Sequence, residues 1–207
     1  MHPLYHRLVT CEALDGCFAP RALQAVVAAN LRQDGPFGQL GHPEFHFDHN
    51  AFAPGWDFVA RSHAAIRPAL AAGKPAAAWS AFGRLTHAVQ DLYAHSDYVR
   101  LWLARFPEGA TPPPEAIDPD DAALLGDGRL RSGKVYFPYE YLSFVPFLKE
   151  FSRARLPHDA HAWMNLDGPE RGPLFAYVRA AAVKRTALEY RRAVDGLPSE
   201  LRPAFHG

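Results

Sequence analysis

The feature that most constrains the fold is a long run of helical periodicity between about residues 76 and 103. Apolar side chains recur there every three or four positions, namely Trp79, Phe82, Leu85, Val89, Leu92 and Tyr93. With 3.6 residues per turn, this spacing places them along one side of an α-helix. A helix with so broad an apolar face has to be covered by other elements. The sequence therefore predicts a helix at the centre of a packed domain.

Three further helices are predicted on either side of this run. Residues 20–33 are rich in alanine and open with a proline, which suits the first turn of a helix. Residues 56–71 again show helical spacing of apolar side chains, and a final helix is predicted over residues 173–194. The aromatic stretch 136–151 is a candidate for one more helix. Tyr93, Trp163 and the aromatic side chains of residues 136–141 are expected in the core and not in contact with substrate.

The segments between these helices are rich in glycine and proline. Residues 36–55 and 157–172 also carry histidines and are predicted to be polar loops. Residues 107–133 contain three consecutive prolines and several glycines, so we expect a long surface excursion there. Strand-like alternation of useful length is absent from the sequence. We therefore predict an all-α fold, a single-domain helical bundle over residues 1–207 with long metal-bearing loops.

Composition excludes several classes of protein. The 22 basic and 22 acidic residues give a formal charge of zero, which argues against a nucleic-acid partner without excluding one. Cys11 and Cys17 are too few for a disulfide-rich scaffold or a four-cysteine zinc site. No apolar run is long enough for a transmembrane helix. The start, Met1-His2, lacks a secretory leader, which favours a cytoplasmic protein unless a leader has been removed.

The predicted central helix carries a polar stripe. His87, Asp91 and His95 follow one another at intervals of four residues and so lie on one side of the helix. Zinc accepts imidazole nitrogen and carboxylate oxygen, and a carboxylate has two oxygens with which to bridge two ions. The alternative is a solvated stripe or a local hydrogen-bonded ladder. The flanking apolar residues, which would bury this helix, favour the metal site.

Three segments of the sequence, one of which contains this stripe, resemble segments of a known protein family. The run from Phe82 to Ser96, Phe-Gly-Arg-Leu-Thr-His-Ala-Val-Gln-Asp-Leu-Tyr-Ala-His-Ser, closely resembles a helix of the Het-C-like proteins. These are relatives of the zinc-dependent bacterial phospholipases C and the P1-type nucleases. The run from Pro43 to Asn50 resembles the family's His-Phe-Asp segment, and the run from His161 to Asp167 resembles its His-x-x-Leu-Asn-Leu-Asp segment. This resemblance implies an all-α fold with zinc ions in a cleft.

The resemblance also implies a set of metal ligands. His87 and Asp91 match a pair on the zinc helix, with Asp91 as the bridge between ions. His46 and Asp34 would complete the first of two or three Zn²⁺ sites. The ligand that holds a further ion beside Asp91 would be His6. His95 and His161 would bind the remaining ion.

This chain departs from the phospholipase pattern in three places. His95 follows Asp91 by four residues, whereas the phospholipases use six with an intervening proline. Those enzymes bind metal through the amine of a mature N-terminal tryptophan, for which His2 is a possible substitute here. Their second His/Glu pair has no clean match. Its role would fall to one of three residues, His158, Asp159 or Asp167. We expect His158, as well as His49 and His63, to be surface or hydrogen-bonded residues.

These residues predict a zinc-dependent phosphoester hydrolase. Adjacent zinc ions would lower the pKa of a bridging water to about 7 and stabilise charge on phosphoryl oxygens. Asp91 would bridge the ions and Asp48 would orient the water. The substrate would be a phosphate-ester small molecule or a lipid head group. The competing hypotheses are a catalytically inactive, metal-stabilised Het-C-like interaction module and a helical bundle without metal.

Overall fold

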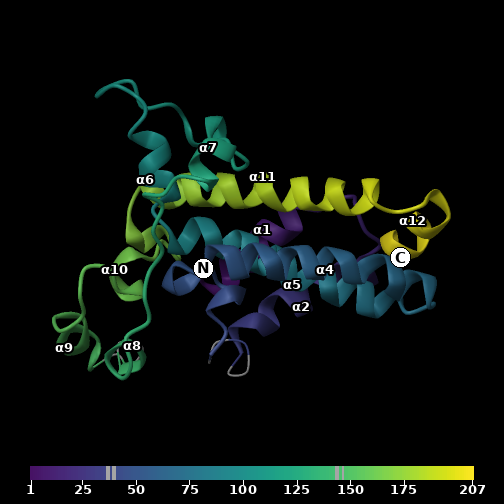
Figure 1. Cartoon of the computed structure of the whole chain (residues 1–207), viewed down its shortest axis with the longest axis horizontal. Coiled ribbons are helices and arrows are strands. Elements are labelled where there is room, and N and C mark those ends of the chain that lie inside the picture. Colours follow the sequence, from purple (N-terminus) through teal and green to yellow (C-terminus); the bar gives the residue numbers. More distant parts are fainter. Residues whose placement is uncertain (36–37, 39–40, 143–144, 146) are drawn as a thin grey trace.

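The computed structural model is a bundle of helices and describes residues 1–35, 38, 41–142, 145 and 147–207 (Figure 1). Within these residues, β structure is limited to two isolated bridges, Ser96 with Ser132 and Lys134 with Ala160. The all-α fold predicted from the sequence is therefore confirmed. In the described part of the chain, no helix is both long and apolar enough to cross a bilayer. Cys11 and Cys17 are both free thiols.

Helix α5 (Pro75–His95) lies at the centre of the bundle. It packs against α2 (Pro20–Leu31), α4 (Phe52–Ala71) and α11 (Leu174–Asp195). From Ala78 onward nearly every α5 residue is buried, because these three helices surround it. The four long helices were predicted from the sequence, and their observed bounds lie within two residues of the predicted ones except at two ends. Helix α4 begins at Phe52, inside the stretch predicted to be a loop, and α5 ends early.

Helix α5 ends at His95, eight residues before the predicted end. Ser96 turns the chain to an extended conformation with a ψ of 172°, and a separate helix α6 (Tyr98–Leu103) follows. The backbone beyond residue 130 causes the break. Gly133 donates its N–H to the carbonyl of His95 at 2.9 Å, and Asp97 donates its N–H to the carbonyl of Arg131 at 3.0 Å. These bonds replace the ones that would continue the helix.

Helix α1 (Pro3–Ala13) was not predicted. Its buried residues are His6, Val9 and Thr10, two of which are polar, so the apolar periodicity that reveals a helix is weak here. The helix lies between α2 and α11. His6 consequently points into the interior of the bundle.

Residues 107–133 follow the surface near α6 and contain η4 (Pro114–Ala116) and α7 (Ala122–Leu125). Ile117 and Leu124 anchor this segment in the core. Tyr93 donates its hydroxyl to the carbonyl of Pro119, which holds the segment against α5. The surface excursion is thus tied to the bundle through its middle part, whereas residues 107–111 are exposed.

At one end of the bundle lie the short helices α8 (Tyr139–Leu142), α9 (Lys149–Arg153) and α10 (His161–Met164), followed by η5 (Pro169–Arg171) (Figure 1). The prediction of one helix over 136–151 was wrong, since the stretch contains α8 and α9 instead. Residues 143, 144 and 146 of this stretch lie outside the described residues. At the opposite end, η6 (Ser199–Leu201) and α12 (Arg202–His206) close the bundle.

Candidate metal centre

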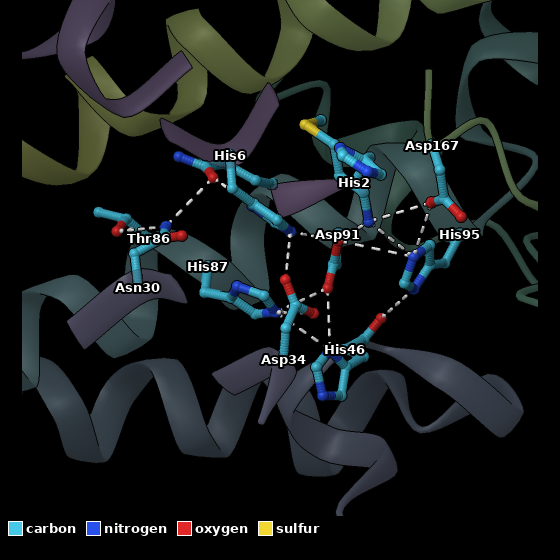
Figure 2. Close-up of polar contacts among 12 residues, drawn as sticks. His2, His6, Asn30, Asp34, His46, Thr86, His87, Asp91, His95 and Asp167 are labelled. Atoms are coloured by element: carbon cyan, nitrogen blue, oxygen red, sulfur yellow. Dashed lines mark hydrogen bonds and ion pairs between the residues drawn. The ribbon is translucent and has the colours of Figure 1, made fainter. Parts of the chain in front are cut away.

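The polar stripe of α5 points into the interior of the protein. His87 and Asp91 are completely buried and His95 is 5% exposed. The three residues are one turn apart at the C-terminal end of α5, where α1, the 43–50 loop and the segment after α10 meet the helix (Figure 2). A solvated stripe is therefore ruled out, and these side chains face other polar groups in the core.

The carboxylate of Asp91 is the centre of this arrangement. Its Oδ2 lies 2.9 Å from Nδ1 of His46 and 2.9 Å from Nε2 of His87. Its Oδ1 lies 3.1 Å from Nε2 of His6 and 3.5 Å from Nε2 of His95. Figure 2 shows these four histidines gathered around the one carboxylate. Each oxygen thus faces imidazole nitrogens, as a carboxylate that bridges two cations would.

Asp34 approaches the same point from the end of η1 (Arg32–Asp34), directly after α2. Its two oxygens lie 3.7 Å from Nε2 of His87 and 4.0 Å from Nε2 of His6. Together with Asp91, these residues form a group whose donor atoms all lie within 4.8 Å of one another. Two nitrogens and two carboxylate oxygens at this separation could hold a tetrahedral zinc ion.

The loop with His46 and Asp48 has an unusual backbone. It contains η2 (Pro43–Phe45) and η3 (Asp48–Asn50), and Phe47, His49 and Asn50 have positive φ angles of 55°, 57° and 58°. Such conformations cost free energy for residues other than glycine and persist only where their surroundings enforce them. Phe47 is fully buried, and a Cβ at Gly55 of α4 would lie 2.5 Å from its ring. The loop is thereby held with His46 and Asp48 in the interior.

Asp48, His95 and His161 form a second group whose donor atoms lie within 4.8 Å of one another. Oδ1 of Asp48 is 3.2 Å from Nδ1 of His95, and the rings of His95 and His161 are 4.4 Å apart. Asp48 was expected to orient a water. Its place among potential metal ligands makes it a candidate ligand as well.

Glu140 of α8 is a site residue that sequence reasoning missed. It is buried, and its Oε1 lies 3.2 Å from Nδ1 of His161. The available signal was a single acidic residue in an otherwise aromatic stretch, Tyr-Phe-Pro-Tyr-Glu-Tyr. That signal is weak, because nothing in the spacing links Glu140 to a histidine 21 positions later.

Of the three candidates for completing the second site, Asp167 reaches the cluster. Its Oδ1 lies 3.2 Å from Nε2 of His95 and 3.0 Å from the main-chain nitrogen of Met1. Asp159 instead pairs with Lys134 at 2.8 Å on the surface. His158 lies beside the ring of Trp163.

The amino group of Met1 also points into the cluster. It contacts Oδ1 of Asp91 and lies 2.9 Å from Nε2 of His95. Burial opposes its protonation, but the carboxylates of Asp167 and Asp91 outweigh burial and raise its pKa to about 11. A positive charge therefore lies where these carboxylates meet. The side chain of His2, by contrast, is exposed and accepts the N–H of Leu4 at the start of α1.

The remaining histidines expected to be structural lie outside the cluster. Nε2 of His49 accepts the N–H of Val135 at 3.2 Å. Nε2 of His63 lies 2.6 Å from Oε2 of Glu189, near the C-terminal end of α11.

Electrostatics favour the protonation states that bind metal in the first group. Burial, followed by the neighbouring His6, lowers the pKa of His87 to about 3. Burial also lowers the pKa of His6. The pKa of Asp91 is far below its ordinary value because His95, the Met1 amine and His87 outweigh its burial. Neutral imidazoles and an ionised carboxylate are the forms that coordinate zinc.

One further observation tests the fit of a cation. Nε2 of His6 is completely buried, forms no hydrogen bond with the described residues, and faces Oδ1 of Asp91 at 3.1 Å. A buried polar atom without a hydrogen bond is costly. A cation between this nitrogen and the carboxylate would satisfy both. The donor set and this atom fit a metal ion.

Comparison with known proteins adds one match. Residues 9–111, just under half of the chain, match the family model described as the VWA7 N-terminal domain. The matched region includes Asp34, His46 and the α5 stripe, whereas His6 and His161 lie outside it. No curated protein and no solved structure gives a significant match. None of these comparisons names the zinc-dependent phospholipases, the P1-type nucleases or the Het-C-like proteins.

Proposed function

We propose that this chain is a zinc-dependent phosphoester hydrolase with a single domain of the phospholipase C/P1 nuclease type. The observation that carries the proposal is the environment of Asp91, a buried carboxylate whose two oxygens each face imidazole nitrogens. The ions would be held by His6, Asp34, His46, His87, Asp91, His95 and His161, with Asp167 and Glu140 beside the second group.

The ligand types favour zinc. Imidazole nitrogen and carboxylate oxygen in a four-atom group suit zinc, whereas magnesium and calcium prefer oxygen ligands alone. Bound zinc lowers the pKa of a coordinated water to about 7 and offsets negative charge on phosphoryl oxygens. The motif resemblance of the α5 helix supports the same chemistry.

The protein's own residues would supply the geometry of the reaction. Asp91 would link the two groups, because its Oδ1 lies 3.1 Å from Nε2 of His6 in the first group and 3.5 Å from Nε2 of His95 in the second. Asp48 stands beside His95, where it can accept a proton or complete the second group. The side chain of Asp167 is 27% exposed, which is more than any side chain of the two candidate metal groups. We infer that a phosphate ester, either a small molecule or a lipid head group, enters on this side.

The proposal is tested by metal content and turnover measured together. We expect two or three zinc ions per purified chain, and a loss of zinc in Asp91→Ala. Asp57→Ala is the matched control, because Asp57 is an exposed carboxylate paired with Arg61 and should leave the zinc content unchanged. The zinc-loaded protein should hydrolyse bis(p-nitrophenyl) phosphate or phosphatidylcholine, and a chelator should abolish hydrolysis. Wild-type protein without zinc would contradict the proposal.

A second candidate is a metal-stabilised interaction module without turnover. The burial of the first group favours it, since His6, His87 and Asp91 are fully enclosed and structural zinc sites are closed. In that case zinc supplies folding free energy. Zinc-loaded protein that hydrolyses neither phosphodiesters, phosphomonoesters nor phospholipids, yet loses thermal stability with chelator, would identify the module.

A further inference from the structure

A buried polar layer lies directly behind His6. Gln90 precedes Asp91 on α5 and is completely buried. Its Oε1 lies 2.6 Å from Nδ1 of His6, the ring nitrogen that points away from the Asp91 carboxylate. A short contact of this kind in the core determines which ring nitrogen carries the hydrogen.

The amide of Gln90 is held by side chains from three other helices. Its Nε2 donates to the hydroxyls of Thr10 on α1 and Thr186 on α11, both at 3.0 Å. Asn30 on α2 donates its Nδ2 to Oε1 of Gln90 at 3.1 Å. Both amide hydrogens of Gln90 are thus used by hydroxyls. The oxygen is the atom that faces His6.

A carbonyl oxygen only accepts hydrogen bonds, so Nδ1 of His6 donates to Gln90. In the neutral ring, Nε2 then presents a lone pair toward Oδ1 of Asp91 at 3.1 Å and Oδ2 of Asp34 at 4.0 Å. This explains why Nε2 forms no hydrogen bond there.

We propose that Gln90 is a positioning residue that fixes His6 as the Nδ1–H tautomer and aims its Nε2 at a zinc ion shared with Asp34 and Asp91. The inference rests on the proposed zinc binding. In this proposal, the polar layer formed by Gln90, Thr10, Asn30 and Thr186 orients a metal ligand. The same layer also packs four helices together. Such outer partners raise metal affinity by orienting the ring.

The first test is the tautomer itself, measured by nitrogen-15 NMR on zinc-free protein with labelled histidine. The His6 signals are assigned from their loss in His6→Asn. We expect a protonated Nδ1 and an unprotonated Nε2 in the wild-type protein. A His6 ring that carries its hydrogen on Nε2 and none on Nδ1 in the wild-type protein would overturn the inference, whatever the variants do.

The second test is titration with Zn²⁺ against a chromogenic chelator. Gln90→Leu removes the acceptor and should weaken binding of one zinc ion by about 10- to 100-fold. Gln90→Glu keeps an acceptor at this position and should bind within a few-fold of wild type or more tightly. Val89→Ala is the control for a general disturbance of buried α5 and should bind like wild type.

Equal zinc affinity in Gln90→Leu and wild type would overturn the inference while leaving the proposed function intact. Equal weakening by Val89→Ala would overturn it also, because the effect would then be one of packing. Failure of wild-type protein itself to bind zinc is a different result and overturns the proposed function with it. If Gln90→Leu does not fold, Thr186→Val removes one partner that holds the amide and should still weaken zinc binding several-fold.

Discussion

Glu189 on α11 lies in a second buried charge cluster, whose members are not among the candidate metal ligands. Its Oε2 is 2.6 Å from Nε2 of His63, and its Oε1 is 2.6 Å from Nε of Arg185 and 2.8 Å from Arg192. Burial opposes ionisation of Glu189, but the hydrogen bond from His63 and the charge of Arg185 lower its pKa to about 2. Glu189 therefore stays ionised and paired over most of the pH range.

This lowered pKa predicts an acid-dependent loss of stability. Because the folded pKa lies below the ordinary 4.5, the interaction stabilises the fold fully above about pH 4.5 and is lost as the pH falls toward 2. The shift corresponds to roughly 3 kcal/mol. Urea unfolding should show that the penalty of Glu189→Gln shrinks by roughly 2 kcal/mol between pH 7 and pH 3.

The control for this measurement is Glu12→Gln, since Glu12 pairs with Arg179 on the surface and such pairs contribute about 0–1 kcal/mol. Other carboxylates titrate in the same window, so the quantity compared is the difference between variant and wild type at each pH. A difference that does not change with pH would contradict the lowered pKa of Glu189.

At the scale of single residues, the sequence predicted most members of the cluster but not all its contacts. The α5 stripe follows from helical geometry alone, which fixes His87, Asp91 and His95 on one side. Joining them to His46 and His161 required the motif resemblance, because no local rule relates loops that are far apart in the chain. Glu140 depends on how residues 134–161 fold back, and that path follows from backbone pairing between Lys134 and Asp159, which no pattern encodes.

The burial of the aromatic side chains was predicted only in part. Tyr93 was expected in the core and is completely buried. Trp163 and the 136–141 aromatic stretch were also expected there, yet Trp163 is 39% exposed and Phe137 is 82% exposed. The side chain of Tyr141 lies outside the described residues. Apolar character predicts burial only within a periodic helix, and this stretch has no long helix to impose one.

At the scale of elements, α2 and α5 approach one another unusually closely at Gly83. A Cβ at this position would lie 2.3 Å from the carbonyl oxygen of Val26 and 2.7 Å from Cβ of Ala29. The absence of a side chain lets α2 bring Asn30 to the polar layer and Asp34 to the cluster. A glycine within a helix is weakly unfavourable by propensity, so close packing accounts for its presence.

Gly83→Ala should therefore destabilise the protein even though alanine favours helices. The added methyl group has only backbone and a Cβ to displace, and overpacking of this kind costs about 1–3 kcal/mol. Calorimetry should show Tm lowered by about 2–12 °C for a chain of this size. Gly128→Ala is the control, because nothing lies within 4 Å of its Cβ position and Tm should stay within a degree or two. An unchanged or raised Tm for Gly83→Ala would mean that the helices are not in contact there.

The ends of elements were less predictable than their existence. Helix α5 has helical periodicity through residue 103, yet the chain turns at Ser96. The cause is the hydrogen bond from Gly133 to the carbonyl of His95, a contact with a segment nearly forty residues later. This turn also matters for the site, because a helix running past His95 would prevent the 132–135 segment from bringing His161 beside it.

At the scale of the whole molecule, the candidate ligands join parts of the chain that are distant in sequence. His6 comes from α1, Asp34 from η1, His46 from a strained loop and His161 from α10. In the unfolded chain these donors are separated and cannot form one site. Zinc bound only to the folded state, as proposed, would therefore stabilise the entire bundle through mass action.

Zinc should accordingly raise the thermal stability of the metal-depleted protein. At a free zinc concentration about 100 times Kd, one site contributes about 2.7 kcal/mol, which corresponds to about 5–11 °C in Tm for a domain of this length. Differential scanning calorimetry of chelator-treated protein, with and without added Zn²⁺, measures the shift directly. Mg²⁺ should produce little change, since it prefers oxygen ligands. Asp91→Ala should abolish most of the zinc-induced shift, whereas Asp57→Ala should retain it. A shift of equal size in Asp91→Ala would place the stabilising ion elsewhere and detach the polar stripe of α5 from metal binding.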